Sequence, residues 1–148
     1  MSGEEQNGPS TRVGEMSADP RFEVEVLVNG VVRASARVSL MRTEVARPLC
    51  KSIQDAARTT NAHGLVMDLN TLGRATPSVG LFAMSKLKGM VVERIALVGG
   101  NAFMRTFARV VLTVGRFGHF AFFEHESEAI AWAAGGSNSL SGQTQSAT

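Results

Sequence analysis

The sequence predicts an α/β fold in which a single layer of helices covers a mostly parallel sheet opened by a β-hairpin, in the order ββαβαβαβα. Three observations predict it. An Asn-Gly pair separates two alternating apolar segments, an apolar run at 64–69 indicates a buried central strand, and residues 93–132 have the pattern of strand, helix, strand and helix. Two strands joined by one helix form a right-handed parallel crossover.

The length and composition indicate one domain. The chain has 148 residues, of which 44% are hydrophobic, so it can bury a core. We expect the domain to span residues 21–134. Residues 1–20 and 135–148 are rich in polar and small side chains and are expected to be flexible, because they cannot bury enough apolar surface. The first segment has no pattern of a signal peptide and Cys50 is the only cysteine, so we expect a cytoplasmic protein.

Charge and motif content argue against several function classes. The net charge of +2 comes from 15 basic and 13 acidic residues, without a run of like charge or a basic stripe interleaved with aromatics. We therefore expect no nucleic-acid partner. No Walker loop, Gly-x-Ser-x-Gly elbow, His-Glu-x-x-His or dinucleotide fingerprint is present, and the three histidines lack metal-ligand spacing. We expect no enzymatic activity, no cofactor and no metal site.

The first predicted element is the β-hairpin. Apolar and polar residues alternate over 22–28 and again over 32–38. Asn29-Gly30 lies between them and accepts the positive φ angles of a type I′ turn. The alternation places Val28 on the apolar face. The opposite face, which carries Ser35, is expected to contact water.

Helices are predicted after the hairpin. Apolar residues recur at helical spacing over 45–57, and we expect the regular helix to begin near 46–47, because Pro48 would cost a mid-helix hydrogen bond. In Thr76-Pro77, a threonine cap precedes a proline at the first helical position, which is a helix start signal. Asn101 follows a glycine pair and is expected to cap the next helix.

The order of elements and their motifs resemble the SpoIIAA-like branch of the STAS superfamily (sulfate-transporter and anti-sigma-factor-antagonist domains). The resemblance covers roughly residues 22–134. It is carried by GLVMDLN with Thr76-Pro77 beyond it, by ERIALVGGNAFMRTFARVV and by AFFEHESEAIAWA. It implies a singly wound β/α layer structure that binds partners or ligands and performs no chemistry of its own.

The resemblance also implies a candidate switch residue. In the anti-sigma-factor antagonists of the family, a serine at the start of the helix after the central strand is phosphorylated to switch partner binding. Their pattern is Asp-Ser-Ser-Gly-Leu, and this chain has TPSVGL at 76–81. Aligning Gly80 with the family glycine places Ser78 on the switch serine, with one inserted residue and with Pro77 in place of the acid. The alternative is an ordinary small polar residue in a helix first turn.

Four further residues are candidates for binding. Asp68 lies near the carboxyl end of the central strand, where α/β sheets place ligands, although tethering of the next loop is the favoured role. Asn101 and the preceding glycines could cradle an anion, although a tight turn is favoured. Arg105 and Arg109 share a helix face. The two arginines could bind an acidic partner or lipid headgroups, or they could form a solvated helix face. The core side of the same helix is expected to carry Phe103, Phe107, Val110, Val111 and Val114.

Together these features predict a non-catalytic bacterial regulatory or binding module. We expect it to dock a protein partner through the loop and helix start at 70–80 and the neighbouring face of the 101–116 helix. The alternative is a carrier or sensor of a lipophilic small molecule, with or without membrane association, that uses an apolar crevice between the helices beginning near Thr76 and Asn101. An enzyme without a recognisable motif is the remaining alternative. An unprotected hairpin edge would also permit a homodimer.

Overall fold

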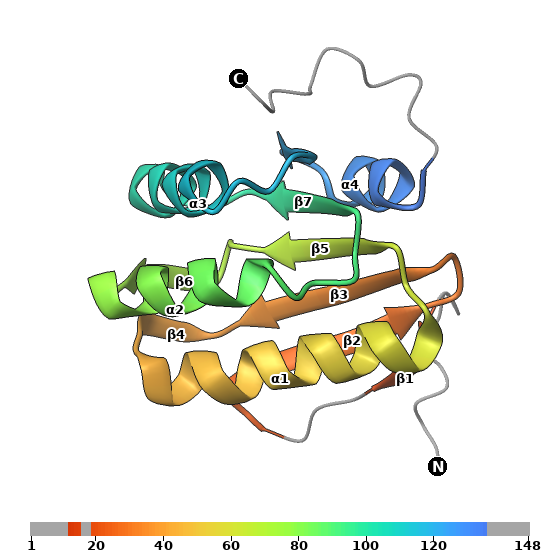
Figure 1. The fold of residues 1–148 in the computed structure, drawn as a ribbon, viewed down its shortest axis with the longest axis horizontal. Helices are drawn as coiled ribbons and strands as arrows, with labels where there is room; N and C mark the ends of the chain where they lie inside the picture. Colours follow the sequence, from red (N-terminus) through yellow and green to blue (C-terminus); the bar gives the residue numbers. More distant parts are fainter. Residues whose placement is uncertain (1–11, 16–18, 136–148) are drawn as a thin grey trace.

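A six-stranded sheet lies at the centre of the computed structural model, which describes residues 12–15 and 19–135 (Figure 1). Its strands, in spatial order, are β1 (Arg12–Glu15), β2 (Phe22–Leu27), β3 (Val31–Ala36), β5 (Gly64–Asp68), β7 (Arg94–Val98) and β8 (Phe120–Phe123). The pairings from β3 to β8 are parallel, whereas β2 pairs antiparallel with β1 and with β3. A separate parallel pair joins β4 (Val38–Met41) and β6 (Leu72–Ala75).

The described residues form four helices, which cover both faces of this sheet. They are α1 (Thr43–Thr60), α2 (Pro77–Leu87), α3 (Ala102–Val114) and α4 (Glu126–Ala133). Successive strand residues point to opposite faces, so the sheet supports two cores. Leu65 and Ile95 belong to the core that contains residues of α1, α2 and α3. Val66 and Ala96 belong to the second core, with Trp132 of α4.

The predicted fold class is confirmed, since the chain forms an α/β structure on a mostly parallel sheet opened by a β-hairpin. The expected single layer of helices holds for α1, α2 and α3. The short helix α4 adds a layer on the opposite face, because Trp132 packs on Phe123, with ring centroids 5.7 Å apart. The position of α4 therefore corrects the prediction of one helix layer.

Strands β1, β4 and β6 are not predicted from the sequence. Strand β1 lies within residues 1–20, where we expected a flexible tail, and pairs with the outer edge of β2. It therefore covers the hairpin edge through which a homodimer was considered. Strands β4 and β6 are short and carry exposed side chains, so they lack a clear alternating pattern. The tail residues at 1–11, 16–18 and 136–148 lie outside the described residues, so the expectation that they are flexible stays a prediction.

Two details of the hairpin and α1 differ from expectation. Val28 is 63% exposed because β2 ends at Leu27, and Val28 belongs to the turn. The second hairpin face is not fully wet, since Ser35 is buried and Val31 packs in the core with α4. Helix α1 begins at Thr43 and includes Pro48, so the prediction of a start near 46–47 was wrong. A proline so near the helix start removes only one hydrogen bond from an 18-residue helix.

The packing of α4 on the sheet generates a prediction for Gly64. A Cβ atom at this position would lie 2.1 Å from the carbonyl oxygen of Ala133. We expect Gly64→Ala to lower the free energy of unfolding by about 1–3 kcal/mol, because α4 must move away from the sheet. Denaturant unfolding followed by circular dichroism measures this change.

Gly89→Ala is the matched control, because an added Cβ there meets no described atom within 4 Å. We expect this variant to change the free energy of unfolding by less than about 0.5 kcal/mol. Equal stability of the two variants would contradict the close packing of α4 on β5.

Candidate functional site

The loop after β5 and the turn after β7 meet at the carboxyl edge of the sheet, where α/β folds place their sites. Asp68 Oδ1 accepts a hydrogen bond of 2.9 Å from the Asn70 N–H group. Asn70 Oδ1 in turn accepts a bond of 3.3 Å from the Gly100 N–H group. Asp68 thus tethers the loop that leads to α2, which is the role that the sequence favoured.

Asp68 also belongs to a cluster of charged side chains with Arg33 and Glu126. Its Oδ2 atom lies 3.1 Å from a guanidinium nitrogen of Arg33, and Arg33 also forms an ion pair with Glu126 at the start of α4. Burial lowers the pKa of Arg33, but the hydrogen bond and charge of Glu126, with further acidic charges nearby, raise it by more. The cluster therefore consists of paired charges that connect β3, β5 and α4, and both carboxylates of the cluster are engaged.

Asn101 caps α3, as predicted, and also binds strand β6. Its Oδ1 atom accepts a hydrogen bond of 2.8 Å from the Met104 N–H group. Its Nδ2 atom donates a bond of 2.9 Å to the Gly73 carbonyl. Gly99 and Gly100 have φ angles of 66° and 94°, which favour glycine. The turn interpretation fits this geometry, since the Gly100 N–H group that an anion would need already binds Asn70.

The start of α2 has the predicted cap and exposes Ser78. The Val79 N–H group donates a hydrogen bond of 3.4 Å to Thr76 Oγ1, and Pro77 occupies the first helical position. Ser78 is exposed, and its hydroxyl lies 3.0 Å from that of Thr76. Gly80 is buried, and a Cβ there would lie 3.3 Å from the ring of Phe107. Gly80 therefore serves the close approach of α2 to α3.

Arg105 and Arg109 lie on a different side of α3 from Gly80. Their guanidinium carbons lie 5.9 and 4.8 Å from the ring centroid of Phe122 in β8. At these distances both cations interact with the face or edge of the ring while remaining exposed. The structure therefore separates the arginines from Thr76 and Ser78, although the sequence analysis grouped all four as candidates.

The sequence analysis missed an exposed apolar stripe on α3. It placed Phe103, Val110 and Val114 on the core side, but their side chains are 40%, 48% and 60% exposed. Apolar residues on α3 follow two stripes, and the core takes the one that contains Met104 and Leu112. The second stripe consists of residues at the helical spacing i, i+4, i+7 and i+11, counted from Phe103. This spacing is the sequence signal by which the second stripe could have been predicted. With Leu81 of α2 the second stripe forms what we call the α2–α3 surface: Leu81, Phe103, Phe107, Val110 and Val114.

The α2–α3 surface lies beside the start of α2. Leu81 is 68% exposed and follows Gly80, which packs against Phe107. Arg74, in the strand before α2, has its guanidinium carbon 4.9 Å from the ring centroid of Phe103. The segment at 70–80 and one face of α3 are therefore adjacent, as the sequence analysis expected, but apolar side chains dominate that face.

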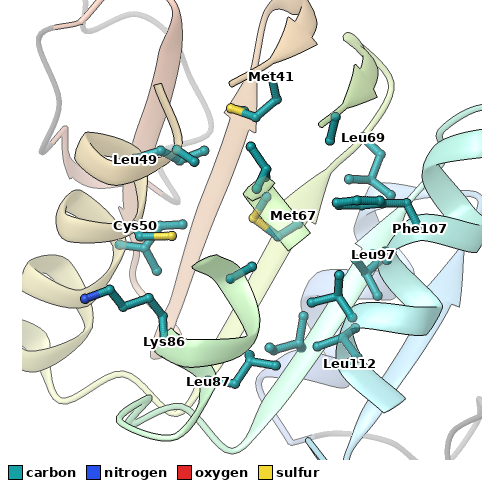
Figure 2. Close-up of a pocket in the computed structure, with 18 of the residues that line it drawn as sticks. Met41, Leu49, Cys50, Met67, Leu69, Lys86, Leu87, Leu97, Phe107 and Leu112 are labelled. Atoms are coloured by element: carbon teal, nitrogen blue, oxygen red, sulfur yellow. The ribbon is translucent and has the colours of Figure 1, made fainter. Parts of the chain in front are cut away.

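An apolar cavity of about 170 Å³ lies between the sheet and helices α1, α2 and α3 (Figure 2). Among the side chains that line it are Met41, Leu49, Met67, Phe107 and Leu112. The predicted crevice lay between α2 and α3 only, whereas this cavity also reaches α1. Cys50, placed on the apolar stripe of α1 by the sequence, is half-buried and lines the cavity. Burial raises the pKa of its thiol, which the nearby Lys86 charge partly offsets.

Within residues 12–15 and 19–135, no three His, Cys, Asp or Glu side chains group in a way that could hold a metal ion. In the same residues, no helix combines the length and the apolar character needed to cross a bilayer.

Comparison with known proteins identifies the fold. An uncharacterized protein of the DUF3478 family from Shewanella loihica PV-4, described as having a SpoIIAA-like fold, aligns with a TM-score of 0.59 and 18% identity, over 80% of this chain and 98% of that chain. The anti-sigma factor antagonist SpoIIAA in its unphosphorylated form aligns with a TM-score of 0.53 and 18% identity, over 77% of this chain and 98% of that chain. The chain therefore has a SpoIIAA-like fold, as the sequence resemblance predicted.

The similarity lies in structure and not in sequence. No protein-family model matches the chain, and no curated protein matches it. At 18% identity the two alignments show the fold alone.

The two bonds of Asn101 generate a prediction about the site. We expect Asn101→Ala to lower the free energy of unfolding by about 1–2 kcal/mol, because α3 loses its cap and Gly73 loses its side-chain donor. Amide hydrogen exchange in residues 70–80 should also become faster, since the loop loses one tether. Unfolding and exchange mass spectrometry measure the two effects.

Thr106→Ala is the control, because Thr106 is exposed on the same helix. This variant should leave exchange in residues 70–80 unchanged. If Asn101→Ala destabilised the protein without faster exchange in that loop, the loop would not depend on Asn101.

Proposed function

We propose that the protein is a non-catalytic regulatory module of the bacterial cytoplasm that binds a protein partner through the start of α2 and the α2–α3 surface. The observation that carries this proposal is the exposure of apolar side chains on two helices that pack together at Gly80 and Phe107, above all Leu81 of α2 with Val110 and Val114 of α3. Single exposed apolar residues are common in soluble proteins, but grouped ones mark interaction sites. One protein of the same fold is described as an anti-sigma factor antagonist, which supports a regulatory role.

The charge around this surface indicates the chemistry of the partner. Helices α2 and α3 contain no Asp or Glu that would repel an acidic segment. Arg74 places a cation against Phe103 of this surface. A partner segment that presents apolar side chains flanked by acidic ones would match this surface, because its charges would be complementary.

Ser78 offers a way to regulate such binding. Its hydroxyl is exposed at the second position of α2, where the positive end of the helix dipole favours a phosphate. A phosphate would add a charge of about −2 beside the α2–α3 surface. It would repel an acidic partner, so we propose that phosphorylation of Ser78 releases it.

Charged substitutions on the apolar surface test partner docking. We expect the double variant Leu81→Asp and Val110→Asp to lose at least about 90% of the partner that the wild-type protein captures, because the new carboxylates would be buried at the interface. Affinity capture from the source cells with quantitative mass spectrometry measures the loss. Both side chains are exposed, so the fold should be retained.

Val91→Asp is the matched control, because Val91 is 46% exposed but lies outside α2 and α3. It should capture the same partner as the wild-type protein. Equal capture by the double variant and the control would refute docking at the α2–α3 surface.

The proposed switch has its own test. Ser78→Asp should weaken partner binding about tenfold, whereas Ser78→Ala should leave it unchanged, because only the former adds negative charge at the surface. Ser85→Asp adds the same charge to an exposed position of the same helix and serves as the control. Titration of the purified partner measures the affinities, and equal weakening by Ser78→Asp and Ser85→Asp would count against a specific switch.

A second candidate function is binding of a lipophilic small molecule, as a carrier or sensor. The apolar cavity is the observation that favours it. Its volume of about 170 Å³ is below the range of about 300–1,000 Å³ for drug-sized ligands. It is close to the roughly 150 Å³ of an apolar cavity that binds benzene. The cavity therefore suits a short apolar group and not a whole long-chain lipid.

A further inference from the structure

The apolar cavity adjoins a second space that has a different character. A groove of about 240 Å³ lies between α1 and α2 and is lined by Arg47, Cys50, Lys51, Gln54, Phe82 and Lys86. Cys50, Phe82 and Lys86 also line the cavity, so the two spaces share a wall. Figure 2 shows Cys50 of α1 and Lys86 of α2 on the same side of the cavity. The inner space is apolar, whereas the outer one is cationic.

Two cations are positioned at the boundary between these spaces. The guanidinium carbon of Arg47 lies 5.0 Å from the ring centroid of Phe82, and the Lys86 ammonium lies 5.3 Å from it. Within residues 12–15 and 19–135, neither cation forms an ion pair with a carboxylate. The third cation of the groove, Lys51, is paired with Asp55 at 3.0 Å. Arg47 and Lys86 are therefore the two cations of the groove that no carboxylate of the described residues neutralises, so both can bind an anionic ligand.

We propose that this site binds a free aliphatic carboxylate of about six to eight carbons, with its chain in the cavity and its carboxylate between Arg47 and Lys86. This inference rests on the second candidate function, a lipophilic ligand, and names its chemical class. The volume of the inner space sets the chain length, and the two cations beside Phe82 set the charge. Lys86, whose charge also reaches Cys50, lines both spaces and can therefore hold a carboxylate where they meet.

Calorimetric titration with octanoate and octanol tests the proposal. Octanoate should bind the wild-type protein at least tenfold more tightly than octanol, which has the same chain without the charge. Arg47→Gln with Lys86→Gln should remove this advantage and leave octanol binding unchanged. Between butanoate and hexanoate, affinity should rise about fourfold for each added methylene. It should stop rising once the cavity is filled.

Arg58→Gln with Lys88→Gln is the matched control. It removes two positive charges from exposed positions of α1 and of the end of α2 that line neither space. We expect this variant to bind octanoate like the wild-type protein. An equal loss of octanoate affinity in both double variants would overturn the proposal, because net charge alone would then explain binding.

The thiol of Cys50 reports where the ligand lies, since it borders both spaces. Octanoate at saturation should slow alkylation of Cys50 by iodoacetamide at least fivefold, and an unchanged rate would place the ligand elsewhere and overturn the proposal. If octanol and octanoate bound equally well, binding of a lipophilic ligand in the cavity would be supported and the anion site would be refuted. If neither bound, both the anion site and the second candidate function would be refuted.

Discussion

The position of α2 depends on two asparagine side chains that tie the loop after β5 to the turn after β7. Asn70 accepts from Gly100, and Asn101 donates to Gly73 while it caps α3. The pairing of β6 with β4 and the burial of Leu69 and Leu72 also hold the segment between β5 and Thr76. Together with these contacts, the two asparagine bonds fix where α2 begins, and hence where Ser78 lies relative to α3.

Helix α2 separates the two surfaces to which we assign binding. Toward α3, buried Gly80 packs against Phe107 and leaves the apolar α2–α3 surface beside Ser78. Toward α1, Phe82 interacts with both Arg47 and Lys86 and lines the apolar cavity. Only Val79 and Gly80 of α2 are buried.

Local signals in the sequence predicted much of the fold and part of the site. The hairpin, the apolar run at 64–69 and the caps Thr76 and Asn101 each depend on neighbouring residues, and each is confirmed. The predicted type I′ turn was wrong, because Gly30 has a positive φ angle of 81° but Asn29 does not. Features that depend on long-range packing were not predictable in this way. The pattern of α4 cannot specify which sheet face it covers, and α3 has two apolar stripes, of which only packing selects the buried one. Arg47 and Lys86 come together only through the placement of α1 beside α2.

The central claim is that this SpoIIAA-like domain recognises a partner through the α2–α3 surface. Photo-crosslinking in the source cells tests it most directly, with a benzophenone-bearing residue placed at position 81 or, as the reference, at position 91. Both positions are exposed, so either probe can react with a bound protein. The account predicts a discrete covalent protein adduct from position 81 and none from position 91. An adduct from position 91 alone, or no adduct from position 81, would contradict it.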